Sequence, residues 1–403
     1  MISIAVLGFG VVGSGVAELI ETNAARIARG ANDGVRVKYI VDIRDFPDSA
    51  YGGLLIKDFS VVERDPEVTI VVETIGGAGV ALDFTRRCLR AGKSVVTSNK
   101  ELVASHGYEL LTIAREMNVN YLFEASVGGG IPILRPITQC LAANEISEIF
   151  GILNGTTNYV LTRMIKEGES QGYALRQASE KGYAESNPSD DIDGHDACRK
   201  ICILAALCFG RHVYPEYVST EGIGGVSLDD AGYAGRIGYK IKLLGRAFLA
   251  PDNKIAAYVA PHLISEDKLL SNVDGVMNGI IVRGNAIGEV LFYGAGAGKL
   301  PTASAIVADV IDAAKHKSAR KLIGWEAGSP DGMYDIELME TPWYVRTSAS
   351  REDVTRAFGL REVTVISAPG SAETAFTTPA MSGRTIASKM KSLAVLSQYR
   401  IIN

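Results

Sequence analysis

The first 130 residues alternate between short apolar runs and longer stretches with helical periodicity. The apolar runs are residues 2–7, 35–41, 68–73, 94–97 and 120–124. The helical patterns between them are residues 14–27, 81–91 and 102–117. Short continuous apolar runs are typical of parallel strands buried on both faces. Their alternation with helices predicts an α/β fold whose N-terminal part is a doubly wound parallel sheet.

The rest of the chain mixes the two patterns and predicts an α+β domain. Its helical patterns are residues 133–141, 159–167, 174–181 and 302–315. Its strand patterns are residues 145–153, 276–279, 280–283 and 289–293. The glycine loop 294–298 and the helix after it are expected to return to the first domain.

The C-terminal residues predict a small third domain. Its strands are expected at residues 343–349, 363–367, 373–377 and 399–402, and its helices at residues 351–358 and 388–396. The resulting order, βαββαβ, is that of a ferredoxin-like fold. The expected domains are therefore residues 1–130, completed by about 299–325, then residues 131–298, and finally residues 338–403.

A glycine motif follows the first predicted strand directly. It consists of Gly8, Phe9, Gly10, Val11, Val12 and Gly13. Gly8 allows a tight turn, Gly10 lets a pyrophosphate approach the backbone, and Gly13 lets the helix pack closely on the strand. The start of the helix offers free N–H groups to phosphate. The motif predicts a Rossmann domain that binds NAD or NADP through these six residues; a glycine-rich turn in another α/β protein is the alternative.

Further candidate cofactor residues follow the other strands. Asp42 could bind the ribose hydroxyls of NAD, and Arg44 could bind the 2′-phosphate of NADP, so the preference stays open. Thr74, Ile75 and Lys100 come directly after strands, at the edge where ligands of such sheets bind. A charge at the start of a helix is the alternative for Lys100.

The segment 124–132 is too rich in glycine to form a helix. Its backbone carbonyls, together with Glu124, offer the oxygen ligands that a hard cation prefers. A simple hinge at the end of the first domain explains the composition equally well.

Residues 181–200 place a dense polar cluster directly before the uncharged run 201–209. The acidic residues of the cluster are Glu185, Asp190, Asp191, Asp193 and Asp196. Asp196 and Lys200 are four residues apart, on a helix face that continues into apolar positions, so Lys200 is expected to point into the core. A buried lysine beside a carboxylate can donate or relay a proton. The alternative is a helix-stabilising pair worth about 0.5 kcal/mol.

The start of this helix is expected to be capped by Asp193, with Asp196 at the third helical position. A nicotinamide domain followed by this cluster, with no nucleophile–histidine pair, suggests hydride transfer. His195 is the only rival acid–base group in the cluster.

Composition narrows the class of protein. The 403 residues have a net charge of −5 and 47% hydrophobic residues, which argues against binding to nucleic acid or to an anionic membrane surface. No apolar run approaches the roughly 20 residues needed to span a bilayer. The cysteines are Cys88, Cys140, Cys198, Cys202 and Cys208. They are expected to be reduced core thiols of a cytoplasmic protein, and a metal pair of Cys198 with Cys202 is the weaker alternative.

Residues 1–325 resemble the homoserine dehydrogenase family. The stretches that carry the resemblance are GFGVVG, VVTSNKELVA, EASVGGGIP, GILNGTTNYVL, GYAESNPSDDIDGHDACRKICILA and GAGAGKLPTASAIVADVID. The resemblance implies NAD(P)-dependent interconversion of L-homoserine and L-aspartate 4-semialdehyde, a step in threonine and methionine biosynthesis. It also implies a homodimer or homotetramer formed through the second domain.

The resemblance also assigns roles to residues. Lys200 matches the proton donor of the family, and Lys100 matches a second lysine near nicotinamide and substrate. The implied substrate residues are Glu185, Asp196, Gly155, Thr156 and Asp191, although Asp191 also fits a role in shaping the loop. Glu124 and the carbonyls of Val127, Gly129 and Ile131 match a sodium-type site, and Gly298 matches a cofactor contact.

The C-terminal domain is similar to the ACT domain that many family members carry. WYVRTSASREDV replaces the Asp-Arg-Pro-Gly turn expected after its first strand. Threonine is therefore expected to inhibit weakly or not at all. Two other functions stay open: an oxidoreductase acting on another small amino-alcohol or aldehyde, and a non-catalytic nucleotide-sensing protein.

Overall fold

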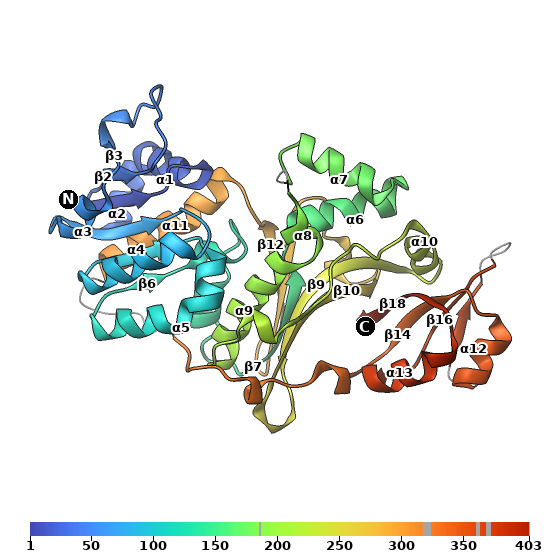
Figure 1. Ribbon diagram of the computed structural model, residues 1–403. Coiled ribbons are helices and arrows are strands. Elements are labelled where there is room, and N and C mark those ends of the chain that lie inside the picture. The colour runs from blue at the N-terminus through green and yellow to red at the C-terminus, as the bar shows by residue number, and fades with distance from the viewer. Residues whose placement is uncertain (185–186, 317–323, 360–362, 368–371, 403) are drawn as a thin grey trace.

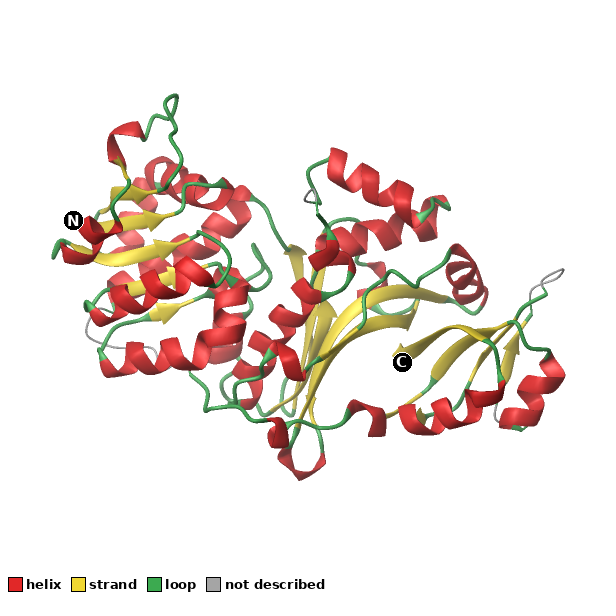
Figure 2. Cartoon of the chain, viewed as in Figure 1, coloured by secondary structure: helices red, strands yellow, loops and turns green. Residues whose placement is uncertain are grey.

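The computed structural model describes residues 1–184, 187–316, 324–359, 363–367 and 372–402. Two sheets organise the chain, with helices packed on both faces of the first and mostly on one side of the second (Figures 1 and 2). Glu185 lies outside the described residues, so the structure does not place this predicted substrate residue.

The first sheet is the predicted Rossmann sheet. Its strands are β1 (Ile2–Leu7), β2 (Val35–Val41), β3 (Leu55–Ile56), β4 (Val68–Glu73), β5 (Ser94–Thr97) and β6 (Tyr121–Leu122). They are parallel in the order β3-β2-β1-β4-β5-β6, the doubly wound order of dinucleotide-binding domains. The prediction of this sheet is confirmed.

Two apolar layers bury this sheet, one on each face. One layer contains α1 (Val11–Thr22), α2 (Ala24–Ala31) and α11 (Lys299–Lys315). The other contains α3 (Phe59–Arg64), α4 (Gly79–Arg90) and α5 (Lys100–Glu116). Residues 299–315 thus return to the first sheet, as the sequence predicts (Figure 1).

The second sheet carries the rest of the site. Its strands are β7 (Ile146–Ile152), β8 (Ser219–Thr220), β9 (Tyr239–Leu249), β10 (Ile255–Ser265), β11 (Met277–Gly284) and β12 (Gly288–Ala295). The helices beside it are α6 (Gly155–Glu167), α7 (Gln171–Glu180), α8 (Ser189–Ile192), α9 (His195–Phe209) and α10 (Leu228–Arg236). Helix α9 packs on β7, β9 and β10 and also contacts α5, so it lies between the two sheets.

The C-terminal residues form the predicted ferredoxin-like arrangement. Its elements are β14 (Trp343–Thr347), α12 (Arg351–Phe358), β15 (Thr364–Ile366), β16 (Thr374–Thr377), α13 (Gly383–Lys389) and β18 (Val395–Ile402). The strands are antiparallel in the order β18-β14-β16-β15. In addition, β18 pairs in parallel with β10, so this small sheet continues the second one. The short strands β13 (Glu340–Thr341) and β17 (Met381–Ser382) pair beside it.

Several predicted elements differ from the structure. The expected helix 388–396 is wrong, because Ser382 caps a helix that ends at Lys389 and residues 395–402 form a strand. The expected helix 14–27 is two helices separated by Asn23. Residues 277–284 form one strand rather than two. Most of the expected helix 133–141 is a π-helical turn, Pro136–Cys140.

The two longest strands of the second sheet were not predicted. Strand β10 is buried along almost its whole length, and its alanines and Pro261 do not produce an alternating pattern.

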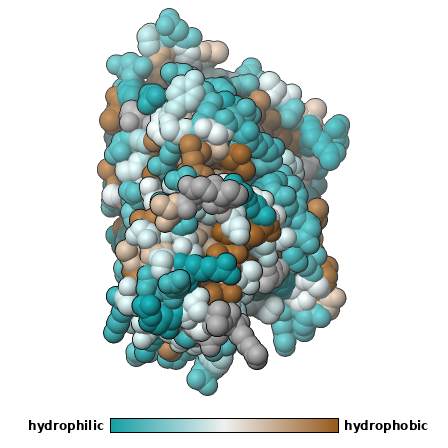
Figure 3. Space-filling view, turned by 90° about the vertical axis from the view of Figure 1, so that its right-hand side faces the viewer, coloured by the Kyte–Doolittle hydropathy of each residue, from teal (hydrophilic) through white to brown (hydrophobic). Residues whose placement is uncertain are grey.

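No described helix is both long enough and apolar enough to cross a bilayer. The face at the C-terminal domain is a mosaic of hydrophilic residues and small apolar groups (Figure 3).

Candidate active site

The glycine motif forms the tight turn between β1 and α1. Gly8 has a φ of +90°, and a Cβ there would lie 2.7 Å from the carbonyl oxygen of Thr74. A Cβ on Gly13 would lie 2.0 Å from the carbonyl oxygen of Gly8. Space opens instead at Gly10, whose nearest neighbour is the Arg44 guanidinium at 3.8 Å from the Cβ position. The turn therefore has room for a ligand where the pyrophosphate is expected.

Asp42 and Arg44 form an ion pair beside this turn. Asp42 Oδ2 accepts a hydrogen bond from the Phe9 N–H at 2.7 Å and pairs with Arg44 Nη2 at 2.9 Å. The guanidinium of Arg44 holds the pKa of Asp42 well below its ordinary value. The Arg44 side chain is itself 60% exposed. The carboxylate is therefore already engaged, whereas the guanidinium remains accessible.

The other predicted cofactor residues line the same edge of the first sheet. The Thr74 hydroxyl donates to the carbonyls of Leu7 and Gly8 at 3.0 and 2.8 Å, which fixes the turn. Gly298 precedes α11 with a φ of +131°. Val11, at the start of α1, is 69% exposed.

Lys200, Lys100 and Asp196 meet where α9 faces the first domain. Lys200 Nζ lies 2.7 Å from Asp196 Oδ2, one helical turn away. Lys100, the first residue of α5, places its Nζ 2.9 Å from Asp196 Oδ1. Lys200 also donates to the backbone carbonyl of Leu153 at 2.8 Å. The predicted pairing of Asp196 with a core-facing Lys200 is confirmed, and one buried carboxylate holds both lysines.

Burial and neighbouring charges shift the pKa values of Lys200, Lys100 and Asp196 in different directions. Burial lowers the pKa of Lys200 below its ordinary value, and this outweighs the opposite effect of Asp196. Attraction to Asp196 raises the pKa of Lys100. Burial disfavours the charged form of Asp196, but the ammonium groups of Lys200 and Lys100 overcome it and hold its pKa well below the ordinary value. Lys200 is thus the more easily deprotonated lysine of the pair.

Asn154 joins the acidic residues to the start of α6. Its Nδ2 donates to Asp191 Oδ1 at 2.7 Å and to Asp196 Oδ2 at 2.9 Å. Its Oδ1 accepts from the Thr157 N–H at 2.8 Å and caps the helix. Burial and the nearby Asp196 raise the pKa of Asp191. The amide therefore fixes the directions of two carboxylates, a role that the helix-capping pattern alone does not reveal.

Gly155 and Thr156 lie next to this network. A Cβ on Gly155 would lie 2.7 Å from the carbonyl of Val276, so only glycine fits there. The Thr156 hydroxyl donates to the carbonyl of Tyr183 at 2.7 Å. Both predicted residues are thus close to Asp191 and Asp196.

Two other predictions about α9 fail. The helix begins at His195 after Gly194, which has a φ of +85°, and no side chain caps it. The expected cap by Asp193 is therefore wrong, and Asp196 is the second helical residue. His195 is exposed, so it does not share the buried position of Lys200.

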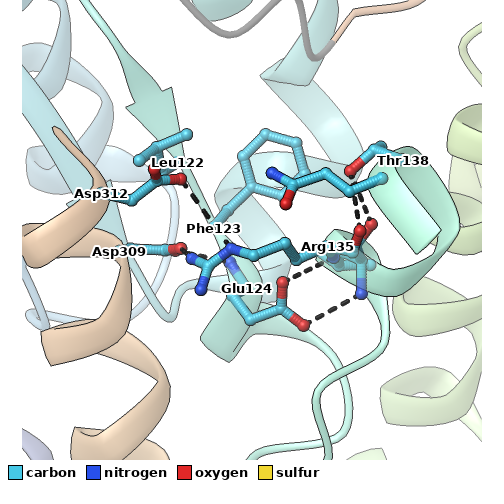
Figure 4. A pocket seen from close by; sticks show the side chains of 9 residues that line it. Leu122, Phe123, Glu124, Arg135, Thr138, Asp309 and Asp312 are labelled. Carbon is cyan, nitrogen blue, oxygen red and sulfur yellow. Dashed lines mark hydrogen bonds and ion pairs between the residues drawn. The ribbon is translucent and has the colours of Figure 1, made fainter. Parts of the chain in front are cut away.

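The Glu124 carboxylate organises the glycine-rich connection between the domains (Figure 4). Its Oε1 accepts from the Ile133 N–H at 2.7 Å, and its Oε2 accepts from the Arg135 N–H at 2.7 Å. Asp309, which pairs with Arg135, accepts from the Glu124 N–H at 2.9 Å. Burial raises the pKa of Asp309 to about 7.

The side chain of Glu124 is therefore engaged as a helix cap. Any cation here would be held by backbone carbonyls. Within the described part of the chain, no backbone hydrogen bond ends at the carbonyls of Val127, Gly129 or Ile131. Gly128 and Gly129 have φ values of +75° and +52°, which turn the backbone sharply here. No group of three or more His, Cys, Asp or Glu side chains that could hold a metal occurs among the described residues.

Fold and site together define an oxidoreductase that depends on a nicotinamide dinucleotide. A Rossmann domain supplies the cofactor turn, and a second domain supplies a buried lysine–carboxylate pair that can carry a proton.

Comparisons with known proteins agree and name the family. A family model for homoserine dehydrogenase matches residues 132–311, and one for the NAD binding domain of homoserine dehydrogenase matches residues 8–124. The chain is 39% identical over 356 residues to the homoserine dehydrogenase of Pseudomonas aeruginosa, covering 86% of this chain and 82% of that protein. The chain belongs to the homoserine dehydrogenase family.

Solved structures of related proteins extend this likeness to the whole fold. A homoserine dehydrogenase from Thiobacillus denitrificans has a TM-score of 0.90 at 36% identity, covering 100% of this chain and 98% of that one. A hyperthermophilic archaeal homoserine dehydrogenase in complex with NADPH has a TM-score of 0.66 at 30% identity, covering 77% of this chain and 97% of that one.

Proposed function

We propose that this chain oxidises L-homoserine to L-aspartate 4-semialdehyde, reversibly, with Lys200 carrying the alcohol proton. The observation that supports this most directly is the buried Lys200–Asp196 pair at the boundary with the cofactor domain. A nicotinamide cofactor held at the glycine turn would supply the hydride acceptor for the alcohol carbon. Neutral Lys200 takes the hydroxyl proton in oxidation and returns it in reduction.

The neighbouring groups would hold the substrate. The carboxylates of Asp196 and Asp191 suit the substrate ammonium, and Glu185 is proposed as a third acidic contact. The positive charge of Lys100 suits the developing charge on the substrate oxygen. These roles predict that amino-alcohols without the α-ammonium group are poor substrates, because they cannot pair with the carboxylates.

The decisive experiment is steady-state oxidation of L-homoserine with NAD and NADP in parallel. Reduction of either cofactor at a rate that saturates with homoserine is the expected result. Absence of turnover with both cofactors, by folded protein that binds them, would refute the proposed reaction and favour a nucleotide-sensing function.

We further propose that the cofactor site prefers NADP. Asp42 is already engaged by the Phe9 N–H and by Arg44, so it is poorly placed to accept from ribose hydroxyls. The exposed guanidinium of Arg44 lies beside Gly10 and suits a 2′-phosphate. Arg44→Ala should raise the KM for NADP about ten-fold or more and leave the KM for NAD within two-fold. Equal effects on both cofactors would contradict this preference.

Two further proposals concern ions and assembly. The backbone carbonyls of Val127, Gly129 and Ile131 could hold Na⁺ in the connection between the domains, with the negative charge of Glu124 nearby as support rather than as a free ligand. A higher melting temperature in NaCl than in choline chloride would support this site, and equal melting temperatures would argue against it. We also propose a homodimer or homotetramer, which light scattering tests directly.

A further inference from the structure

Asn278 occupies a buried position between the proton-carrying lysine and the second glycine loop. It lies on β11 and is 1% exposed. Its Nδ2 donates to the backbone carbonyl of Leu153 at 2.9 Å. The same carbonyl accepts from Lys200 Nζ at 2.8 Å. Asn278 and Lys200 therefore share one acceptor oxygen.

The other side of the amide touches the loop that leads to Gly298. A Cβ on Gly296 would lie 2.1 Å from Asn278 Nδ2 and 2.6 Å from Oδ1, so the amide packs directly on the Gly296 backbone. This loop is also held by the glycine-rich connection between the domains, because the Gly130 N–H donates to the carbonyl of Ala295 at 3.0 Å. The amide is therefore packed so closely on the loop that a shift of the loop towards it would have to move the amide.

The hydrogen bonds of Asn278 do not explain why a polar side chain occupies this buried position. Asn278 Oδ1 is buried and has no hydrogen-bond partner within the described part of the chain. A buried acceptor without a donor costs stability that a leucine of similar shape would avoid. A role in packing alone therefore does not explain why residue 278 is an asparagine.

We propose that Asn278 is a positioning residue that couples the loop 294–298 to Lys200 through the shared carbonyl of Leu153. The inference rests on the proposed role of Lys200. The amide N–H occupies one lone pair of the oxygen and leaves the other to the lysine, which fixes the direction from which Lys200 can donate. A displacement of the loop moves the amide, and the amide changes the environment of the ammonium group.

The charged groups that face Lys200 come from several elements. Asp196 lies on α9 with Lys200, Lys100 lies on α5, and Asp191 lies on α8. Asn278 adds the positive end of an amide dipole to this set without adding a charge. Its removal should therefore favour the ammonium form of Lys200, and the pH at which homoserine oxidation becomes fast should move upward.

A double-mutant cycle tests the coupling. Asn278→Ala and Gly296→Ala should each lower kcat about ten-fold, which is the effect of one misplaced hydrogen bond. In the double variant, the smaller side chain makes room for the new methyl group, so kcat should fall about ten-fold rather than a hundred-fold. A hundred-fold loss of kcat in the double variant would show that the two sites act independently and would overturn the proposal. A normal kcat in either single variant would overturn it as well.

Asn278→Leu separates positioning from packing. Leucine fills the same space but cannot donate to Leu153, so we expect a ten-fold lower kcat, a nearly unchanged KM for the cofactor and a pH profile shifted upward. Wild-type kcat and an unchanged pH profile in a folded Leu variant would refute the positioning role. If Lys200→Ala retains full activity, the proposed role of Lys200 fails and the coupling through Asn278 fails with it, whereas the proposed reaction is refuted only if the wild-type protein does not oxidise homoserine.

Discussion

Two buried aspartates, Asp196 and Asp230, anchor opposite sides of the second domain. Asp196 lies in the first turn of α9 and holds the two lysines at the junction with the cofactor domain. Asp230 lies in the first turn of α10 and faces the C-terminal domain. Both carboxylates are almost fully buried, so the difference between them lies in their partners.

Both carboxylate oxygens of Asp230 accept hydrogen bonds from several side chains. Arg346 Nε lies 2.7 Å from its Oδ1, and the Ser227 hydroxyl donates to its Oδ2 at 2.7 Å. Tyr344 and Tyr399 donate at 3.2 and 3.3 Å, and Ser397 donates to Oδ1 at 2.5 Å. Burial opposes the charge of Asp230, but these donors lower its pKa overall.

The contrast separates a carboxylate whose partners can titrate from one whose partners keep their protonation. Asp230 is held by an arginine and by hydroxyl groups, none of which changes protonation near neutral pH. Asp196 is shared by two lysines, and one of them has a lowered pKa. Burial alone therefore does not mark a candidate catalytic group, and the ability of its partners to titrate is the better sign.

The largest expected effect lies on the Asp196 side. Lys200→Ala should lower kcat for homoserine oxidation by about 10³-fold, because the proton carrier is lost. Binding of NADP, followed by fluorescence titration, should stay within two-fold. The exposed Lys268 provides a matched control, since Lys268→Ala should leave both values unchanged. Unaltered turnover in Lys200→Ala would exclude the mechanism.

On the other side, Asp230→Ala should affect stability and leave catalysis intact. It removes the fully buried carboxylate that pairs with Arg346 Nε and leaves Glu373 as the remaining carboxylate partner of this arginine, which costs about 3 kcal/mol. Differential scanning calorimetry and limited proteolysis should show earlier unfolding of the C-terminal domain, with kcat of the folded enzyme within two-fold. Asp229→Ala, at the exposed neighbouring position, is the control. A large loss of kcat with an unchanged melting temperature would show that Asp230 contributes to the reaction rather than to stability.

The pH dependence should follow Lys200. Its pKa is lowered, so the neutral form needed for oxidation becomes populated below the ordinary lysine pKa of about 10.4. We expect kcat/KM for homoserine oxidation to rise with pH and to level off below that value. Lys100→Ala removes a positive neighbour and should move this rise to higher pH. If the rise of kcat/KM occurs at the same pH in Lys100→Ala as in the wild type, a group other than Lys200 is responsible for it.

The smallest effect is expected for a peripheral donor of Asp230. Ser397→Ala removes one hydrogen bond from a carboxylate that keeps its other donors, which costs about 1 kcal/mol. A melting temperature only slightly below wild type, with unchanged kcat, should result. A loss as large as that of Asp230→Ala would show that Ser397, rather than Arg346, is the main partner.

The sequence predicted the parts of the fold that depend on local patterns. The Rossmann sheet follows from buried apolar runs and from a glycine motif whose close contacts only glycine allows. The pairing of Asp196 with Lys200 follows from helical spacing. The expected cap by Asp193 failed because Gly194, with a positive φ, occupies the N-cap position and the helix starts at His195.

The remaining parts depend on contacts between distant residues. Asn278 and Leu153 are 125 positions apart, so no pattern in the chain shows that they share a hydrogen bond. Strands β9 and β10 form the centre of a sheet, where burial on both faces removes the alternation that marks a strand. The domain limits, the cytoplasmic location and the response to threonine stay predictions.

The pairing of β18 with β10 has a mechanical consequence. Arg400 to Ile402 lie beside His262 to Ile264 in a parallel ladder, so the C-terminal domain is attached by backbone hydrogen bonds as well as by its connecting segment. A force on this domain would load the ladder in shear and reach β9, against which α9 packs. A displacement of the domain would reach α9, and with it Lys200, through this sheet, because α9 packs on both β10 and β9.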